Sequence, residues 1–179
     1  MQTRNNNLLL FHYLAALAVV SLLTRNFFAG GETRYTTVAW EMWLRSDFLV
    51  PYLNGETYSH KPPLLFWLMH LGWTLFGVNE WWPRLIPFFF SFASLLLIQQ
   101  LGRRLWPDSS DFLMAPFITL GFTIWAFFST AVMFDMMLCF FVLLAITGLH
   151  QALNEQLKRG WLLLGLAWGL GVLSKGPVI

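Results

Sequence analysis

Charged residues are scarce in this 179-residue sequence, in which Asp, Glu, Lys and Arg together make up 11%. Soluble domains carry about a quarter charged residues. Hydrophobic residues account for 57% of the chain, and they recur in runs close to the ~20 residues that a transmembrane helix needs. This composition excludes a soluble domain between the runs and predicts an all-α polytopic membrane protein.

Cysteine is also nearly absent. Cys139 is the only one, which excludes an internal disulfide, and its apolar surroundings predict a small buried hydrophobe. The net charge of +2 is too small and too scattered to predict nucleic acid as a partner. No small-x-small cleavage site follows the apolar run 8–23, so this run is predicted to be an uncleaved signal anchor behind Arg4.

Five segments are predicted to cross the membrane, and a sixth is not. The sixth, Pro63–Val78, is short, opens with two prolines and carries tryptophans, so it is predicted to lie on the outer surface. This threading places the basic pairs at 103–104 and 158–159 with Arg4 on the cytoplasmic side, as the positive-inside rule favours. The N-terminus is then cytoplasmic and the loop 29–83 is outside. The predicted crossings are 8–28, 84–101, 112–128, 134–150 and 161–173.

The outer loop has its own predicted structure. Residues 33–44 have the pattern of an amphipathic helix, and a second surface helix is predicted to begin at Pro63. Asn54-Gly55 marks a turn between them.

Two cations of this loop are candidates for binding phosphate. Lys61 precedes Pro62-Pro63, where the backbone is stiff and a helix N-terminus begins, and both features suit an anion. A lysine that snorkels to the headgroups is the alternative. Arg34 could grip a phosphate with two donors or form a salt bridge with Glu32.

The acidic candidates are Glu32 and Asp135. Glu32 could be a general base, a metal ligand or a partner of Arg34. With His60 it makes only two metal-binding side chains, too few to predict zinc, so no metal site is predicted and a divalent metal cofactor stays open. Asp135 borders a hydrophobic segment and is a functional candidate, or it caps the helix that follows. Lys175 could be an ordinary cation at a helix C-terminus.

Several motifs in order resemble the bacterial GT-C glycosyltransferases of the aminoarabinose transferase and protein O-mannosyltransferase-like family. The resemblance runs from about residue 11 to the end of the chain. The motifs that carry it are Glu-Thr-Arg-Tyr at 32–35, Glu41-Met42, the stretch from Asp47 to Asn54-Gly55, Lys-Pro-Pro-Leu-Leu-Phe-Trp at 61–67, Phe-Gly-Val-Asn-Glu-Trp at 76–81, Gly-Arg-Arg-Leu at 102–105, Asp135 with Phe140-Phe141, and Lys-Gly-Pro at 175–177.

The resemblance implies a GT-C-like N-terminal transmembrane bundle with interfacial helices in the first outer loop. It also implies an inner-membrane enzyme that transfers a hexose or pentose, with inversion, from a polyprenyl-phosphate donor to a hydroxyl of a lipid, glycan or protein. Lipopolysaccharide modification and protein glycosylation are such reactions, and the partners are then the lipid-linked sugar, the acceptor and membrane lipids.

The resemblance also implies roles for individual residues. Arg34 and Lys61 match the positions that contact the donor phosphate, where cations stabilise the leaving group. An acidic residue in the first outer loop, here Glu32, would orient or deprotonate the acceptor, and Asp135 matches a second acidic position. The candidates for lining the substrate pocket are Tyr35, Tyr58, His60 and Lys175.

The chain departs from the family pattern in three ways. Gly31 stands where the family has an aspartate, so Glu32 or Asp135 takes its role, or the activity is altered or lost. His60 replaces a glutamate that is common in the aminoarabinose branch. Family members are several hundred residues long, so the chain is expected to be a truncated N-terminal part, inactive by itself. The alternative function is a non-catalytic lipid-binding, transporter-like or scaffold module of the membrane.

Overall fold

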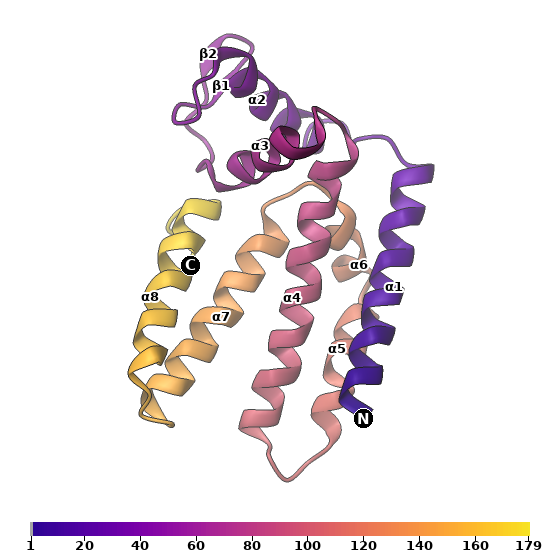
Figure 1. Cartoon of the computed structure of the whole chain (residues 1–179), viewed down its shortest axis with the longest axis vertical. Coiled ribbons are helices and arrows are strands. Elements are labelled where there is room, and N and C mark those ends of the chain that lie inside the picture. The colour runs from indigo at the N-terminus through magenta and orange to yellow at the C-terminus, as the bar shows by residue number, and fades with distance from the viewer. Residues whose placement is uncertain (1) are drawn as a thin grey trace.

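The computed structural model describes residues 2–179, with side chains from residue 5 onward, so the side chain of Arg4 lies outside the described part. Long helical segments run side by side as a bundle, and a smaller cap covers one end of it (Figure 1). The bundle consists of α1 (Gln2–Thr24), α4 (Trp81–Leu105), the segment η1 (Asp111–Leu113), α5 (Ala115–Leu120) and α6 (Thr123–Thr130), then α7 (Asp135–Leu153) and α8 (Lys158–Lys175). The cap consists of α2 (Glu32–Arg45), β1 (Tyr52–Leu53), β2 (Glu56–Thr57) and α3 (Leu64–Phe76). The predicted all-α membrane fold with interfacial helices is confirmed.

Within residues 2–179, three helices are long and apolar enough to cross a membrane, namely α1, α4 and α7. The bent pair formed by 111–120 and 123–130 makes a fourth span if it is counted as one. α8 carries Lys158, Arg159 and Lys175 and is not among these candidates, yet it runs beside α7 for most of its length (Figure 1). The fifth crossing at 161–173 therefore stays a prediction.

The two C-terminal helices approach closely because glycines face each other across their contact. A Cβ atom added at Gly148 would lie 2.8 Å from the backbone nitrogen of Leu164, and one at Gly160 would lie 2.4 Å from that of Ala152. Small residues at such positions let helix backbones pack tightly inside a membrane. This contact holds α8 against α7 and brings its C-terminal end to the cap end of the bundle.

The segment predicted as one crossing at 112–128 is broken. α5 ends at Leu120 and α6 begins at Thr123, with a bend of 69° between the two parts. Phe122 is extended at the break, with ψ at 125°, so the helical hydrogen bonds stop and begin again on its far side. Apolar content alone cannot reveal such a break, because both halves remain hydrophobic.

The first helix is shorter than predicted. α1 ends at Thr24 rather than at Phe28, and residues 25–28 form a non-helical link to α2. The backbone N–H of Phe28 donates to the Glu32 carboxylate at 2.6 Å instead of to a helical carbonyl. A side-chain oxygen four residues further along the chain has therefore taken the place of a helical carbonyl as the acceptor for Phe28.

The cap has the predicted elements. α3 lies across the end of the bundle and not through it, as expected for Pro63–Val78 (Figure 1). The His70 ring bonds the carbonyl of Ala39 at 2.8 Å, which fixes α3 to α2. Asn54 and Gly55 form the turn between β1 and β2 with positive φ angles of 55° and 84°, as an Asn-Gly hairpin turn requires.

Two buried clusters stabilise the two parts. One joins the cap to the top of α7 and includes Val38, Phe66 and Phe134, each at most 1% exposed. The other lies among α1, α4 and α5 and includes Leu10 and Leu95, both fully buried. The cap is thus packed onto the bundle by apolar contacts rather than tethered by a loop.

The arrangement predicts that the β1–β2 hairpin and the α4–η1 turn lie on opposite sides of the membrane. In a Cys139→Ala background, Glu56→Cys and Ser110→Cys should each react with an impermeant thiol reagent from one side only, and the two sides should differ. Both native side chains are exposed, so labelling needs no unfolding. Reaction of both cysteines from the same side of intact cells would contradict this topology.

Candidate functional site

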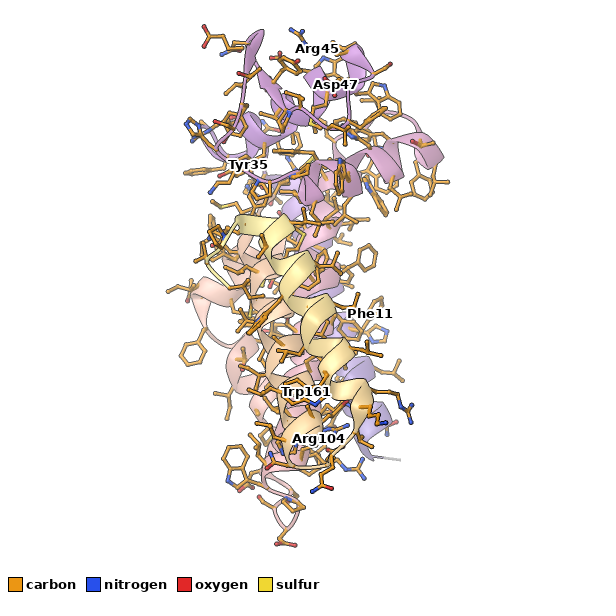
Figure 2. The ribbon with its side chains drawn as sticks, turned by 90° about the vertical axis from the view of Figure 1, so that its left-hand side faces the viewer. Phe11, Tyr35, Arg45, Asp47, Arg104 and Trp161 are labelled. Atoms are coloured by element: carbon orange, nitrogen blue, oxygen red, sulfur yellow. The ribbon has the colours of Figure 1, made fainter. Side chains whose placement is uncertain are left out.

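The predicted residues come together where the cap meets the bundle, but they form two separate groups. Figure 2 shows Tyr35 at this junction, whereas Arg45 and Asp47 lie at the far end of the cap and Arg104 at the other end of the bundle. One group is centred on Glu32. The other surrounds Tyr35 and Phe134.

Glu32 lies at the centre of a buried polar cluster, the Glu32 clasp, which it forms with Arg25 and with the backbone N–H groups of Phe28 and Val132. Its side chain is 1% exposed, and Arg25 donates to both carboxylate oxygens, through Nη1 to Oε2 and through Nη2 to Oε1 at 3.1 Å. The backbone N–H of Phe28 donates to Oε2 at 2.6 Å, and that of Val132 to Oε1 at 2.7 Å. Each oxygen therefore accepts two hydrogen bonds.

The clasp determines the ionisation of Glu32. Burial by itself would raise the pKa of this carboxyl group. The hydrogen bonds from Arg25, Phe28 and Val132, together with the charge of Arg25, outweigh burial and lower the pKa below its ordinary value of 4.5. Glu32 is thus a saturated carboxylate, held ionised by donors from two segments of the chain, the link 25–28 and the approach to α7.

Arg34 does not pair with Glu32, although that salt bridge was one of the two readings of the sequence. Its Nε and Nη2 donate to the carbonyl oxygen of Gly30 at 2.9 and 2.5 Å, and its side chain is exposed. The partner of Glu32 is Arg25, to which the sequence patterns assigned no role. A guanidinium seven residues before a carboxylate, just past an apolar run, was the available signal.

The second group is aromatic at its centre. The ring of Phe134 is packed edge-on by Tyr35 at 4.8 Å between centroids, and the Nζ of Lys61 lies 5.7 Å from the same ring centroid. The Tyr58 ring packs edge-on against His60 at 5.2 Å. Lys61 therefore faces an aromatic surface, and the described residues include no carboxylate in salt-bridge contact with it.

Asp135 and Lys175 form an ion pair beside this cluster. The Nζ of Lys175 lies 2.7 Å from Oδ1 of Asp135, and the two side chains are 27% and 31% exposed. Asp135 is the first residue of α7, and its side chain does not cap that helix. The pair joins the start of α7 to the end of α8.

The Tyr35 phenol lies among charged and polar groups of this junction. Burial raises the pKa of the Tyr35 phenol, and the charges of Tyr58 and Asp135 raise it further, while Arg34 opposes them. Side chains from α2, the 58–61 loop and α7 therefore act on one another electrostatically. The arrangement offers two cations without an acidic partner, one paired carboxylate and an aromatic wall, which is a chemistry suited to an anionic group with an attached ring.

The residues present do not fit a metal centre. Glu32 has both oxygens occupied by four donors, and His60 packs against Tyr58 rather than beside Glu32's clasp. In the part of the chain that the structure describes, no group of three or more His, Cys, Asp or Glu side chains is placed to hold an ion.

The Glu32 clasp predicts a pH-dependent stability. Because the folded-state pKa is lowered, the clasp stabilises the fold above about pH 4.5, and this contribution is lost as the pH falls through the folded-state pKa. Glu32→Gln should lower the free energy of unfolding at pH 7 by about 2 kcal/mol, below the value for a fully buried pair because Arg25 is 29% exposed. The melting temperature of the Glu32→Gln variant should also fall less than that of the native protein when the pH is lowered through the acidic range. The matched control is Glu56→Gln, which removes an exposed carboxylate of the hairpin and should melt as the native protein does.

The comparisons with known proteins bear on the family and the fold. Residues 60–179 match the family described as dolichyl-phosphate-mannose-protein mannosyltransferase. The undecaprenyl phosphate-alpha-4-amino-4-deoxy-L-arabinose arabinosyl transferase of Pseudomonas aeruginosa (strain LESB58) is 32% identical over 98% of this chain and 33% of its own length. The corresponding transferase of Erwinia tasmaniensis is 30% identical over 94% of this chain and 31% of its own.

A solved structure shares the fold. The crystal structure of ArnT from Cupriavidus metallidurans bound to undecaprenyl phosphate superposes with a TM-score of 0.82 at 25% identity, covering 96% of this chain and 32% of that one. The chain spans about one third of the length of the curated relatives that it matches. With two thirds of the chain matched by the family and nearly all of it by aminoarabinose transferases, the protein belongs to the GT-C membrane glycosyltransferases of the dolichyl-phosphate-mannose-protein mannosyltransferase family.

Proposed function

We propose that this chain takes part in the transfer of a sugar from a polyprenyl-phosphate donor to an acceptor hydroxyl at the non-cytoplasmic face of the membrane. The observation that carries the proposal is the pair of cations, Lys61 and Arg34, beside an aromatic wall at the membrane-facing base of the cap. The relatives named for undecaprenyl-phosphate sugar transfer support the same donor class.

The orientation follows from charge. The basic residues of the α4–η1 and α7–α8 turns lie at the end of the bundle opposite the cap, and short loops rich in Lys and Arg are retained in the cytoplasm. The cap and the site then face outward, the N-terminus is cytoplasmic, and α8 completes a fifth crossing. The cytoplasmic set consists of Arg103, Arg104, Lys158 and Arg159.

The donor phosphate would be held by cations that have no other acidic partner. Arg34 bonds only a backbone carbonyl and keeps part of its guanidinium free for a second acceptor. Lys61 contributes a compact ammonium charge over the Phe134 ring. Two such cations would also stabilise the phosphate as it leaves the anomeric carbon. Tyr58 and His60 would line the adjoining pocket.

The carboxylate that acts on the acceptor is best assigned to Asp135. Gly31 supplies no carboxylate, and Glu32 has no free lone pair that faces outward from its clasp. Asp135 is partly exposed and accepts from Lys175 through Oδ1. The ammonium of Lys175 would orient Asp135 through Oδ1, while Oδ2 remains able to accept a proton from, or orient, a sugar hydroxyl.

A non-catalytic lipid-binding module is the second candidate, because Gly31 stands where the family has an aspartate. Such a protein would keep the phosphate-binding cations and lack transfer. The two functions differ in one observable, since both bind a polyprenyl phosphate but only the enzyme releases it from a sugar.

Lys61→Met tests the phosphate site in the native protein purified from its own membranes. Loss of a cation that bonds a phosphate costs ~2 kcal/mol or more, so the dissociation constant of undecaprenyl phosphate should rise at least tenfold. Lys158→Met at the opposite end of the bundle removes the same charge and should leave this constant unchanged. Equal affinities of the native protein and Lys61→Met would refute the assignment.

Asp135→Asn tests the catalytic step. Transfer of sugar should fall by ~10²–10⁴ because a general base or orienting carboxylate is lost, while undecaprenyl phosphate should bind no more weakly, since a negative charge has been removed. Asp111→Asn, in η1 at the other end, is the control. Native rates in Asp135→Asn would exclude this carboxylate, and phosphate binding by a native protein that transfers no sugar would favour the lipid-binding module.

A further inference from the structure

The link between α1 and α2 is anchored by two arginines to which the transfer reaction assigns no role. The guanidinium of Arg25 donates to both oxygens of Glu32 and, through Nη2, to the carbonyl of Thr130 at 3.0 Å. The carbonyl of Arg25 in turn accepts from Nη1 of Arg84 at 2.6 Å, and the Arg84 guanidinium lies 4.5 Å from the ring centroid of Phe27. Four separate segments of the chain meet at these side chains.

The clasp joins positions that are far apart in the sequence. The hydrogen bond from the Val132 N–H to Glu32 spans 100 residues, and the two residues are 0% and 1% exposed. Glu32 begins α2, and Val132 lies in the segment that leads from α6 to α7. A single carboxylate therefore connects the first turn of the cap helix to the approach of a bundle helix.

Both sides of the proposed site lie close to this connection. Arg34 and Tyr35 follow Glu32 by two and three residues, and Asp135 follows Val132 by three. Beside the clasp, Tyr35 packs against Phe134 ahead of α7, and the rest of α2 packs chiefly on α3 and β1 within the cap. The clasp is thus a direct polar connection between α2 and the segment before α7. It fixes the orientation of Arg34 and Tyr35 relative to Asp135.

We propose that Arg25, acting through Glu32, is a positioning residue that holds the phosphate-binding face of α2 in register with Asp135 at the start of α7. The role of Glu32 is then to accept four hydrogen bonds from two segments of the chain, not to exchange a proton with the acceptor. Arg84 supports the clasp by holding the backbone of Arg25. The inference rests on the proposed sugar transfer for its consequence in catalysis, but the positioning itself is a property of the fold.

An ion pair suits this task better than an apolar contact. A bidentate guanidinium and two backbone N–H donors fix the direction as well as the distance of a carboxylate, whereas apolar surfaces can slide. Removing one partner leaves the other as a buried, uncompensated charge. Removing both charges leaves no such charge, although a Gln amide nitrogen would then face one of the two backbone N–H donors. If Arg25 and Glu32 position the site, the double variant should therefore be less impaired than either single variant. If Glu32 acts in catalysis, removing Arg25 as well should restore nothing.

The test is a double-mutant cycle in the native protein with Arg25→Gln, Glu32→Gln and the double variant. Each single variant should weaken undecaprenyl phosphate binding and lower sugar transfer, both by roughly tenfold, a size typical of coupled buried pairs. The double variant should recover part of both losses, because no uncompensated buried charge remains. Arg25→Lys, which keeps the charge but not the fork of donors, should fall between native and Arg25→Gln.

Other outcomes overturn the inference. If Glu32→Gln abolishes transfer, binds undecaprenyl phosphate normally and is not rescued in the double variant, Glu32 acts in the chemistry itself. If no variant changes binding or transfer, the clasp does not position the site. If the native protein neither binds undecaprenyl phosphate nor transfers sugar, the proposed function is refuted. The positioning role of Arg25 is then tested by a distance measurement alone.

The second measurement needs no activity. Spin labels at Leu44 on α2 and Leu153 on α7, which are 63% and 58% exposed, report the distance between cap and bundle in a Cys139→Ala background. Arg25→Gln should broaden the distance distribution, and the double variant should narrow it again. If Arg25→Gln does not fold, the same comparison is made with Arg25→Lys. A distribution as narrow as native in every folded variant would overturn the proposal.

Discussion

The buried carboxylate of Glu32 is the polar interaction that, together with the apolar packing of Tyr35 on Phe134, sets the arrangement of cap and bundle. An ionised group with 1% exposure is costly unless donors replace water, and here Arg25 and two backbone N–H groups do so. Those donors come from the end of α1 and from the approach to α7. Satisfying one charge therefore fixes three segments relative to one another, and it also explains why α1 stops before Phe28.

The candidate site is built on the side of α2 that this clasp orients. Apolar packing of Tyr35 and Phe134 supplies its wall, while Lys61 and Arg34 remain without acidic partners among the described residues. Asp135, in contrast, is already paired with Lys175. Unpaired cations next to a paired carboxylate make a site that attracts an anion without neutralising itself, which fits a phosphate carried by a membrane lipid.

Much of the architecture was predictable from local patterns. Apolar runs located the long helices, the short length and paired prolines of Pro63–Val78 placed α3 on the surface, and Asn54-Gly55 gave the hairpin turn. Each of these signals lies within a few residues of what it predicts. The helix break at Phe122 could not be predicted from hydrophobicity, because the segments on both sides of it are apolar. Lys175 and Asp135 were both candidates, but their pairing could not be predicted because they lie 40 residues apart.

The sequence by itself determined the membrane class, the family and the residues worth testing, because composition, run length and ordered motifs are properties of the chain alone. Only the tertiary structure decided which charges meet. It paired Glu32 with Arg25 instead of Arg34, and Asp135 with Lys175, and it left Lys61 facing a ring. Ion pairs are selected by the distance between side chains after packing, and the packing of α2 against α7 depends on contacts between residues about 100 positions apart.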